Sequence, residues 1–299
     1  MKIGLAQTNA VIGDFPGNVK RLLAAYRECL DAGAELVITP ELSLVGYPPR
    51  DLVFKSLFVP KCLHALDHLA GEIREVPLIV GYVDHFDTPR PGKPFRNAAG
   101  WLENGEIRHK IWKTLLPTYD VFDERRYFEP GESCEPILWN GRRIGITICE
   151  DIWTEDYLQR PLYDRGPAPE LAAKGIDVLL NLSASPFHLG KPAQRRQMLG
   201  AVARQAKAPV VYCNSVGGND QLVFDGYSVV VRADGETAAQ LPGFKEATLV
   251  IDPFDASDTH PIAEAEDSED LYNALVLGLR DYATKCGFSS VCLGLSGGI

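Results

Sequence analysis

The sequence has no long apolar run and no excess of positive charge, and each absence excludes a class of protein. No segment approaches the roughly 18–20 apolar residues that cross a bilayer, so no membrane partner is expected. The N-terminus, MKIGLAQTN, lacks the apolar stretch and cleavage site of a signal peptide, which predicts a cytoplasmic protein. With 30 Lys and Arg against 40 Asp and Glu, the net charge of −10 argues against nucleic acid as a partner, because phosphates repel an acidic chain.

The cysteines and histidines lack the spacing of a metal site or a disulfide framework. The seven cysteines are odd in number, widely spread and without a CxxC pair, which favours reduced thiols. His64 and His68 are four residues apart on a predicted helix, but no HExxH-type carboxylate accompanies them. We therefore predict no metal site and a solvated helix face at these histidines.

The apolar pattern is that of a folded α/β protein. Hydrophobic residues make up 45% and charged residues 23% of the chain, so it can bury a large core without disulfides. Short apolar segments alternate with helical periodicity. Strands are predicted over residues 2–8, 34–39, 77–83, 177–182 and 209–214, and helices over 16–32, 52–75 (interrupted at Pro60) and 193–207.

Hairpins are predicted between these elements. Asn-Gly between alternating segments is the strongest local hairpin signal, and Asp-Gly acts in the same way. Turns at Asn104-Gly105, Asn140-Gly141 and Asp234-Gly235 predict hairpins over residues 97–113, 136–148 and 227–241. Crossover helices combined with hairpins predict an α/β fold whose mixed sheets are covered by helices.

The composition changes after Ile251. Residues 1–252 are interpreted as one domain, and the acidic, Pro-containing stretch 253–270 as a linker. A helix over 271–285 and a short strand over 291–295 are expected next, followed by Ser296, Gly297 and Gly298. A buried strand that leads into a glycine-rich loop is typical of the beginning of a domain. We therefore expect residues 271–299 to be the truncated start of a second domain.

Three reactive side chains stand at or near the ends of apolar strands: Glu41, Lys113 and Cys149. Taken singly, each has an ordinary explanation. Cys149 is then a buried structural thiol, Glu41 a capping or salt-bridged carboxylate, and Lys113 a solvated lysine at a strand end.

Taken together, the three residues match the needs of amide or nitrile hydrolysis. A Cys thiolate is the strongest side-chain nucleophile near neutral pH. A neighbouring ammonium lowers the thiol pKa and stabilises the oxyanion, and a carboxylate carries the proton to the departing ammonia. No histidine stands close to Cys149 in the sequence, which argues against a Cys-His pair.

The segments PELSLVGYPPRDL, KTLLPTYDVFDERRYFEPG and GITICEDIW resemble the carbon–nitrogen hydrolase (nitrilase) superfamily. They are most similar to the glutaminase domains of glutamine-dependent NAD⁺ synthetases, in matching order over residues 1–252. The terminal GLSGGI resembles the start of the pyrophosphatase-type loop that grips ATP phosphates in the synthetase domain of that family. The resemblance implies a four-layer α-β-β-α sandwich.

The resemblance also implies a set of site residues. Glu41, Lys113 and Cys149 correspond to the catalytic triad, and Glu124 to a carboxylate that positions Lys113 and the substrate amide. The positions that recognise glutamine map onto Tyr119, Ser185 and Lys191, with Tyr47 and Trp153 as pocket walls. Lys191 could face the α-carboxylate; a polar loop is the alternative for Ser185 and Lys191. Ser296, Gly297 and Gly298 would be an incomplete ATP-binding loop.

The function that follows from the resemblance is release of ammonia from L-glutamine through a Cys thioester. The glutaminase domain would need no cofactor, whereas the synthetase domain would use ATP and Mg²⁺ to amidate nicotinic acid adenine dinucleotide. Family resemblance suggests a homo-oligomer. Two alternatives stay open: a freestanding amidase, carbamoylase or nitrilase of the same superfamily, and a catalytically silent scaffold.

Overall fold

Two six-stranded sheets form the centre of the computed structural model, which describes residues 1–86, 91–153, 162–264 and 266–298. In the first sheet, of order β14-β1-β2-β3-β4-β5, the strands β1, β2 and β3 are parallel and the outer pairs antiparallel. The strands are β1 (Ile3–Gln7), β2 (Leu36–Ile38), β3 (Leu78–His85), β4 (Phe95–Glu103), β5 (Glu106–Trp112) and β14 (Ala247–Ile251).

The second sheet repeats this plan. In its order, β13-β12-β9-β8-β7-β6, the strands β7, β8 and β9 are parallel and the outer pairs again antiparallel. The strands are β6 (Ile137–Trp139), β7 (Arg142–Ile148), β8 (Val178–Ser183), β9 (Val210–Asn214), β12 (Val229–Val231) and β13 (Thr237–Gln240). A two-stranded sheet adds β10 (Val216–Asn219) and β11 (Leu222–Asp225).

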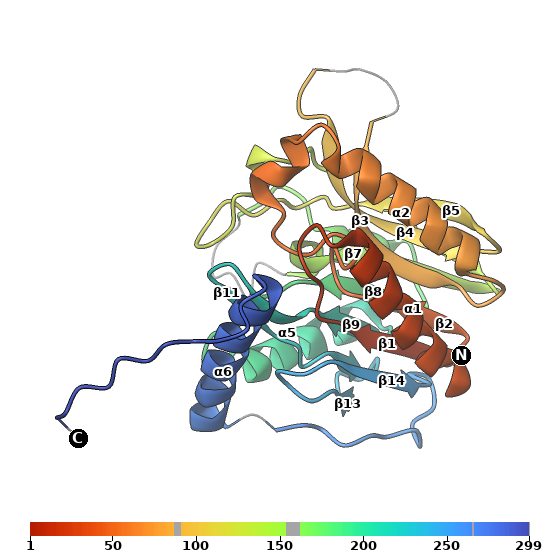
Figure 1. The fold of residues 1–299 in the computed structure, drawn as a ribbon. Coiled ribbons are helices and arrows are strands. Elements are labelled where there is room, and N and C mark those ends of the chain that lie inside the picture. The colour runs from red at the N-terminus through yellow and green to blue at the C-terminus, as the bar shows by residue number, and fades with distance from the viewer. Residues whose placement is uncertain (87–90, 154–161, 265, 299) are drawn as a thin grey trace.

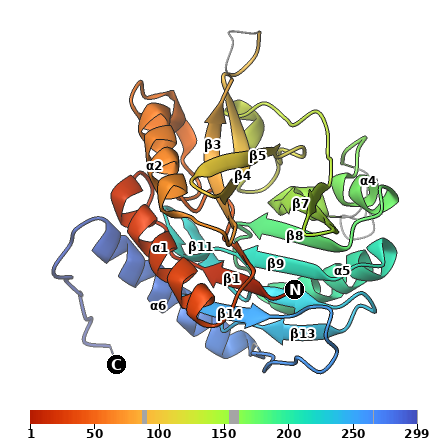
Figure 2. The same cartoon turned by 90° about the vertical axis from the view of Figure 1, so that its right-hand side faces the viewer.

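The helices cover the outer faces of the sheets. Figure 2 shows α1 and α2 on one side, α4 and α5 on the other, and the strands between them. The α-helices are α1 (Phe15–Asp31), α2 (Phe58–Glu72), α4 (Pro167–Ala173), α5 (Lys191–Ala206) and α6 (Asp267–Lys285), and the 3₁₀ helices η1 (Arg50–Phe54), η2 (Glu124–Arg126) and η3 (Cys149–Ile152).

Alternation along the central strands builds the layers, because successive side chains point to opposite faces of a sheet. In β2, Leu36 and Ile38 belong to the core between the sheets, whereas Val37 belongs to the core under α1 and α2. In β9, Val211 lies in the central core and Tyr212 in the core under α4 and α5. Both faces of each sheet are thus buried, and the predicted α-β-β-α sandwich is confirmed.

Apart from the strand expected over 291–295, the predicted strands and hairpins are present, with ends that differ by a few residues. The interruption placed at Pro60 is wrong. The break falls between η1 and α2, and Pro60 occupies the third position of α2, where a helix needs no backbone N–H donor. The pattern did not reveal α4, β14 or the β10–β11 hairpin.

The C-terminal part differs from expectation at two points. Helix α6 begins at Asp267, inside the predicted linker, and Ala274 and Leu277 pack against Val216, Tyr227 and Phe244. The predicted strand over 291–295 is absent, and Val291, Leu293 and Leu295 are exposed. Figure 1 shows this segment leading away from the body of the molecule. An apolar run without a neighbouring strand cannot satisfy its backbone hydrogen bonds as a strand.

Two further observations concern the classes of site considered above. Within the described ranges, no helix is both long and apolar enough to cross a membrane. The same ranges contain no cluster of three or more His, Cys, Asp or Glu side chains arranged to hold a metal ion. His64 and His68 lie exposed on α2.

Candidate active site

The polar centre of the molecule lies where strands of the two sheets end. Glu41 follows β2, Lys113 follows β5 and Cys149 follows β7, while Ser183 is the last residue of β8. The Glu41 backbone N–H donates to the Ser183 carbonyl at 3.3 Å, so the strand ends of the two sheets are joined directly. This meeting of strand ends brings residues distant in the sequence to one place.

Lys113 bridges two carboxylates. Its Nζ atom lies 2.7 Å from Glu41 Oε1 and 2.7 Å from Glu124 Oε1. Tyr47 Oη donates to Glu124 Oε1 at 2.8 Å, and Asn97 Nδ2 donates to Glu41 Oε1 at 2.7 Å. All five side chains are buried, so the alternative of a solvated Lys113 is wrong.

The charges of this cluster are strongly coupled. Burial acts to lower the Lys113 pKa, but Glu124 and Glu41 together outweigh it and hold that pKa well above its usual value. Burial raises the pKa of Glu124 to about 7, against the lowering effect of Lys113, and Glu41 adds to the increase. One ammonium shared by two buried carboxylates leaves a net negative charge, and a proton bound to Glu124 would neutralise it.

Cys149 directly follows β7 as the first residue of η3, and its backbone there has a φ of +47°. Its Sγ atom accepts a hydrogen bond from Ser183 Oγ at 3.4 Å. Burial raises the thiol pKa; Glu41 raises it further and Lys113 opposes the increase. These electrostatic contributions connect Cys149 to both ends of the Glu41–Lys113 pair.

Asp151 ties the Cys149 turn to the end of β5. Its carboxylate accepts hydrogen bonds from the backbone N–H groups of Thr114 at 3.0 Å, Leu115 at 2.7 Å and Ile148 at 3.2 Å. Since Thr114 directly follows Lys113 and Ile148 directly precedes Cys149, these bonds fix the two chain segments relative to each other.

Of the residues predicted to bind glutamine, Tyr119 and Lys191 both lie near Glu150, the residue after Cys149. Tyr119 Oη donates to Glu150 Oε1 at 2.7 Å, and Tyr163 Oη donates to the same oxygen at 3.0 Å. Burial lowers the pKa of Lys191, while the negative charges of Cys149 and Glu150 act in the opposite direction. Glu150 is itself buried, and burial raises its pKa.

The remaining predicted pocket residues take different positions. Lys191 Nζ lies 5.0 Å from the centroid of a Trp153 ring, a cation–π arrangement. The Ser185 N–H donates to Asn214 Oδ1 at 2.9 Å, so Ser185 is fixed to the end of β9. Tyr47 bonds Glu124 and not the Glu150 group. Ser296, Gly297 and Gly298 are exposed in the C-terminal segment.

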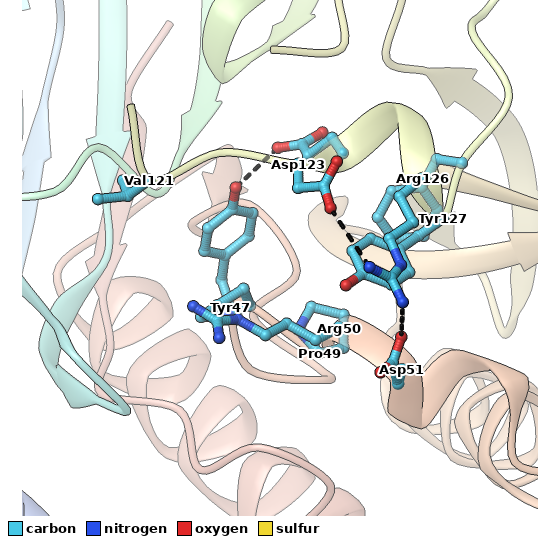
Figure 3. A pocket seen from close by; sticks show the side chains of 11 residues that line it. Tyr47, Pro49, Arg50, Asp51, Val121, Asp123, Arg126 and Tyr127 are labelled. Atoms are coloured by element: carbon cyan, nitrogen blue, oxygen red, sulfur yellow. Dashed lines mark hydrogen bonds and ion pairs between the residues drawn. The ribbon is translucent and has the colours of Figure 1, made fainter. Parts of the chain in front are cut away.

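A cavity of about 380 Å³ opens beside Tyr47 and Glu124. In Figure 3 the Tyr47 hydroxyl points toward the η2 segment, and Arg126 extends between Asp51 and Asp123. Glu41, Lys113 and Cys149 do not line this cavity. Glu124 therefore connects the buried Lys113 cluster with a space that is open at the surface.

Several residues of the site were not anticipated. Asn97, Ser183 and Asp151 form hydrogen bonds with the predicted residues or their neighbours, and Tyr212 forms one with Ser183. Asn97 and Ser183 carry one recognisable signal, since a polar residue in a mostly apolar strand is costly to bury without a partner.

A family model described as carbon–nitrogen hydrolase matches residues 2–264. Two glutamine-dependent NAD(+) synthetases are similar over nearly the whole chain. That of Synechocystis sp. is 39% identical over 99% of this chain and 55% of its own length. That of Thermotoga maritima is 35% identical over 100% of this chain and 56% of its own. The chain thus spans about half the length of these relatives.

Solved structures agree with this comparison. The glutamine-dependent NAD+ synthetase from Acinetobacter baumannii, determined with adenosine diphosphate, superposes with a TM-score of 0.85 at 32% identity, covering 97% of this chain and 53% of that one. A mutant of the Nesterenkonia sp. AN1 amidase superposes with a TM-score of 0.70 at 25% identity, covering 84% of this chain and 92% of that one. In that amidase, acrylamide has undergone Michael addition at the active-site cysteine.

Proposed function

The chain belongs to the carbon–nitrogen hydrolase family, and from this premise we propose that it releases ammonia from L-glutamine as the glutaminase part of a glutamine-dependent NAD⁺ synthetase. The similarity to such synthetases over nearly the whole chain supports this choice of substrate. The observation that carries the chemistry is the ammonium of Lys113, buried between Glu41 and Glu124 and electrostatically coupled to the Cys149 thiol.

In the first half-reaction, Cys149 is the nucleophile and Glu41 the general base. Glu41 takes the thiol proton as the sulfur attacks the side-chain amide carbon of glutamine. Lys113 and a backbone N–H at the strand-end turn stabilise the oxyanion of the tetrahedral intermediate. The C–N bond then breaks, Glu41 returns the proton to the leaving nitrogen, and ammonia departs from a γ-glutamyl thioester.

In the second half-reaction, water replaces ammonia. Glu41 takes a proton from a water molecule while the oxygen of that water attacks the thioester carbonyl carbon. Lys113 again stabilises the oxyanion. The C–S bond breaks, the proton returns to sulfur, and glutamate leaves. Glu124 acts by holding Lys113: its carboxylate shares the ammonium with Glu41 at 2.7 Å and keeps the cation in place through both steps.

Substrate recognition would use the group of residues beside Glu150. We assign Lys191 to the α-carboxylate of glutamine, Tyr119 and Ser185 to hydrogen bonds with the substrate, and Trp153 to the pocket wall. Tyr47 would wall the site on the Glu124 side, where it donates to that carboxylate. A zwitterionic substrate needs charged partners beyond the amide site, and Lys191 provides one.

The wider assignments rest on the longer relatives. In a full-length enzyme the ammonia would amidate nicotinic acid adenine dinucleotide in a synthetase domain that uses ATP and Mg²⁺. Residues 1–252, 253–270 and 271–299 would be the glutaminase domain, the linker and the start of that second domain. Ser296, Gly297 and Gly298 would open its ATP loop. We further propose a cytoplasmic homo-oligomer.

The direct test is the variant Cys149→Ala. Loss of the nucleophile should reduce ammonia release from glutamine by at least about a thousandfold, measured by a coupled glutamate assay. Cys213→Ala is the matched control, because Cys213 is a buried thiol in the core between the sheets. Glutaminase turnover retained in Cys149→Ala would refute the nucleophile assignment. In a full-length enzyme, the same variant should keep ammonia-dependent NAD⁺ synthesis.

The second candidate is a freestanding amidase of the same superfamily. The superposition of the Nesterenkonia sp. AN1 amidase on 84% of this chain supports this second candidate. Comparing ammonia release from glutamine with release from propionamide and butyramide separates the two functions. A higher kcat/KM for the simple amides would reject glutamine as the substrate. It would also reject the role of Lys191, since those amides have no carboxylate.

A further inference from the structure

A chain of two hydroxyl groups ends on the sulfur of Cys149. We propose that Ser183 donates a hydrogen bond to this sulfur and that Tyr212 orients Ser183, so that the pair favours the thiolate. Ser183 is then a catalytic residue, because it touches the reacting atom, and Tyr212 is a positioning residue. The inference depends on the proposed function only in taking Cys149 as the nucleophile.

The direction of the chain follows from counting protons. Ser183 Oγ lies 3.4 Å from Cys149 Sγ and 2.6 Å from Tyr212 Oη. A serine hydroxyl has one proton, so when Ser183 donates to sulfur it can only accept from Tyr212. Tyr212 must therefore be the donor in the 2.6 Å contact. Two hydroxyl dipoles then point in sequence toward the sulfur, and each strengthens the next in a buried environment.

Tyr212 is buried beside an ion pair. The Arg195 guanidinium lies 5.5 Å from the centroid of its ring, and Arg195 is only 1% exposed. Arg195 Nη2 bonds both oxygens of Asp225, at 3.1 Å and 3.3 Å, and Asn214 Nδ2 donates to Asp225 at 3.0 Å. The buried ion pair thus holds the cation that lies beside the Tyr212 ring.

The surroundings of the thiol make a local donor important. Burial and the Glu41 carboxylate raise the Cys149 pKa, and the Lys113 ammonium, which Glu41 and Glu124 share, opposes this increase. Ser183 also lowers the thiol pKa, through the hydrogen bond that it donates to the sulfur. The other charged and titratable groups that act on the thiol or respond to it are Glu150, Tyr47, Tyr119, Lys191, Arg195 and Tyr212.

The test measures alkylation of Cys149 by iodoacetamide as a function of pH, with the adduct quantified by peptide mass spectrometry in the 299-residue chain. Ser183→Ala should move the apparent pKa of alkylation upward by about one to two pH units, the value of a hydrogen bond to a charged group. Tyr212→Phe removes only the phenol oxygen and should shift the profile in the same direction by a smaller amount.

Tyr26→Phe is the matched control, because it removes a buried phenol that donates to the Val76 carbonyl in a different core. Its profile should equal that of the unsubstituted chain. Unchanged profiles in Ser183→Ala and Tyr212→Phe would overturn the proposal. A shift in the first without one in the second would contradict the chain of hydroxyls. If Ser183→Ala does not fold, Tyr212→Phe decides alone.

The experiment separates this inference from the proposed function, since iodoacetamide needs no glutamine site. A shifted alkylation profile in a chain that releases no ammonia from glutamine would support the hydroxyl chain and reject glutaminase activity. Glutaminase activity combined with unshifted alkylation profiles would support the proposed function and reject the hydroxyl chain.

Discussion

Lys113 shows how a single residue can set the electrostatics of a buried site. Its ammonium lies 2.7 Å from each of two carboxylates that are almost fully buried. The two carboxylates carry two negative charges and the ammonium one positive charge. The net negative charge that is left is buried, where water cannot screen it. The protonation state of Glu124 should therefore change with pH near 7.

This dependence predicts how stability varies with pH. Burial raises the Glu124 pKa from 4.5 to about 7 in the folded chain. Between these values the folded state keeps a proton that the unfolded state has lost, so stability falls as pH rises through this window. The difference in unfolding free energy between the unsubstituted chain and Glu124→Gln should decrease by about 3 kcal/mol between pH 4.5 and pH 7.

Urea unfolding of both proteins across this pH range measures the effect. Glu106→Gln serves as the control because Glu106 is exposed and forms an ion pair with Arg108 at the surface. If the difference in unfolding free energy between the unsubstituted chain and Glu124→Gln stays constant with pH, the Glu124 carboxyl has the same pKa in the folded and unfolded states. Lys113 would then neutralise it fully in the folded state.

The sequence predicted the site residues unevenly, for a physical reason. Glu41, Lys113 and Cys149 are recognisable because each is a reactive group at the end of an apolar segment. Ser183 and Tyr212 lie within strands, and only the pairing of β8 with β9 brings their hydroxyls together. A shift of one residue in that register would direct the side chains to opposite faces. Such contacts depend on tertiary structure and leave no local pattern.

At the level of elements, the central strands were predictable and the edges were not. Strands buried on both faces appear as apolar runs whatever their partners are. The β10 strand, with the sequence VGGN, has too little apolar pattern to be recognised. The run over 291–295 has the pattern but no neighbour, and is not a strand. Periodicity therefore predicts an element only where the tertiary structure supplies a surface for it.

Helix α6 permits a test of this argument, because its two sides differ. Leu277 is 2% exposed and packs in the cluster with Val216 and Tyr227, whereas Leu275 on the same helix is 66% exposed. Leu277→Ala should lower the free energy of unfolding by about 2–5 kcal/mol and speed hydrogen exchange in α6. Leu275→Ala should stay within about 0.5 kcal/mol of the unsubstituted chain. Equal effects would mean that α6 does not pack on the β10–β11 sheet in solution.

At the scale of the whole molecule, the cysteines are distributed over all the layers, so their reactivity shows which layers are folded. All seven are free thiols. Cys29 and Cys62 lie in the core under α1 and α2, Cys213 between the sheets, and Cys134 in the core under α4 and α5. Cys286 and Cys292 are exposed. A thiol reagent such as DTNB should therefore modify these two rapidly, whereas the core thiols Cys29, Cys62, Cys134 and Cys213 should react only after unfolding.

The order in which the buried thiols become reactive tests how the layers cooperate. The central core contains residues of both sheets, so separating the sheets would expose apolar side chains of each. We expect Cys29, Cys62, Cys134 and Cys213 to become reactive in one transition as urea is raised, followed by pulse alkylation and peptide mass spectrometry. Exposure of Cys134 at a lower urea concentration than Cys29 would show instead that the second sheet and its helices unfold independently. The two sheets would then hold the active-site strand ends together only as long as both remain folded.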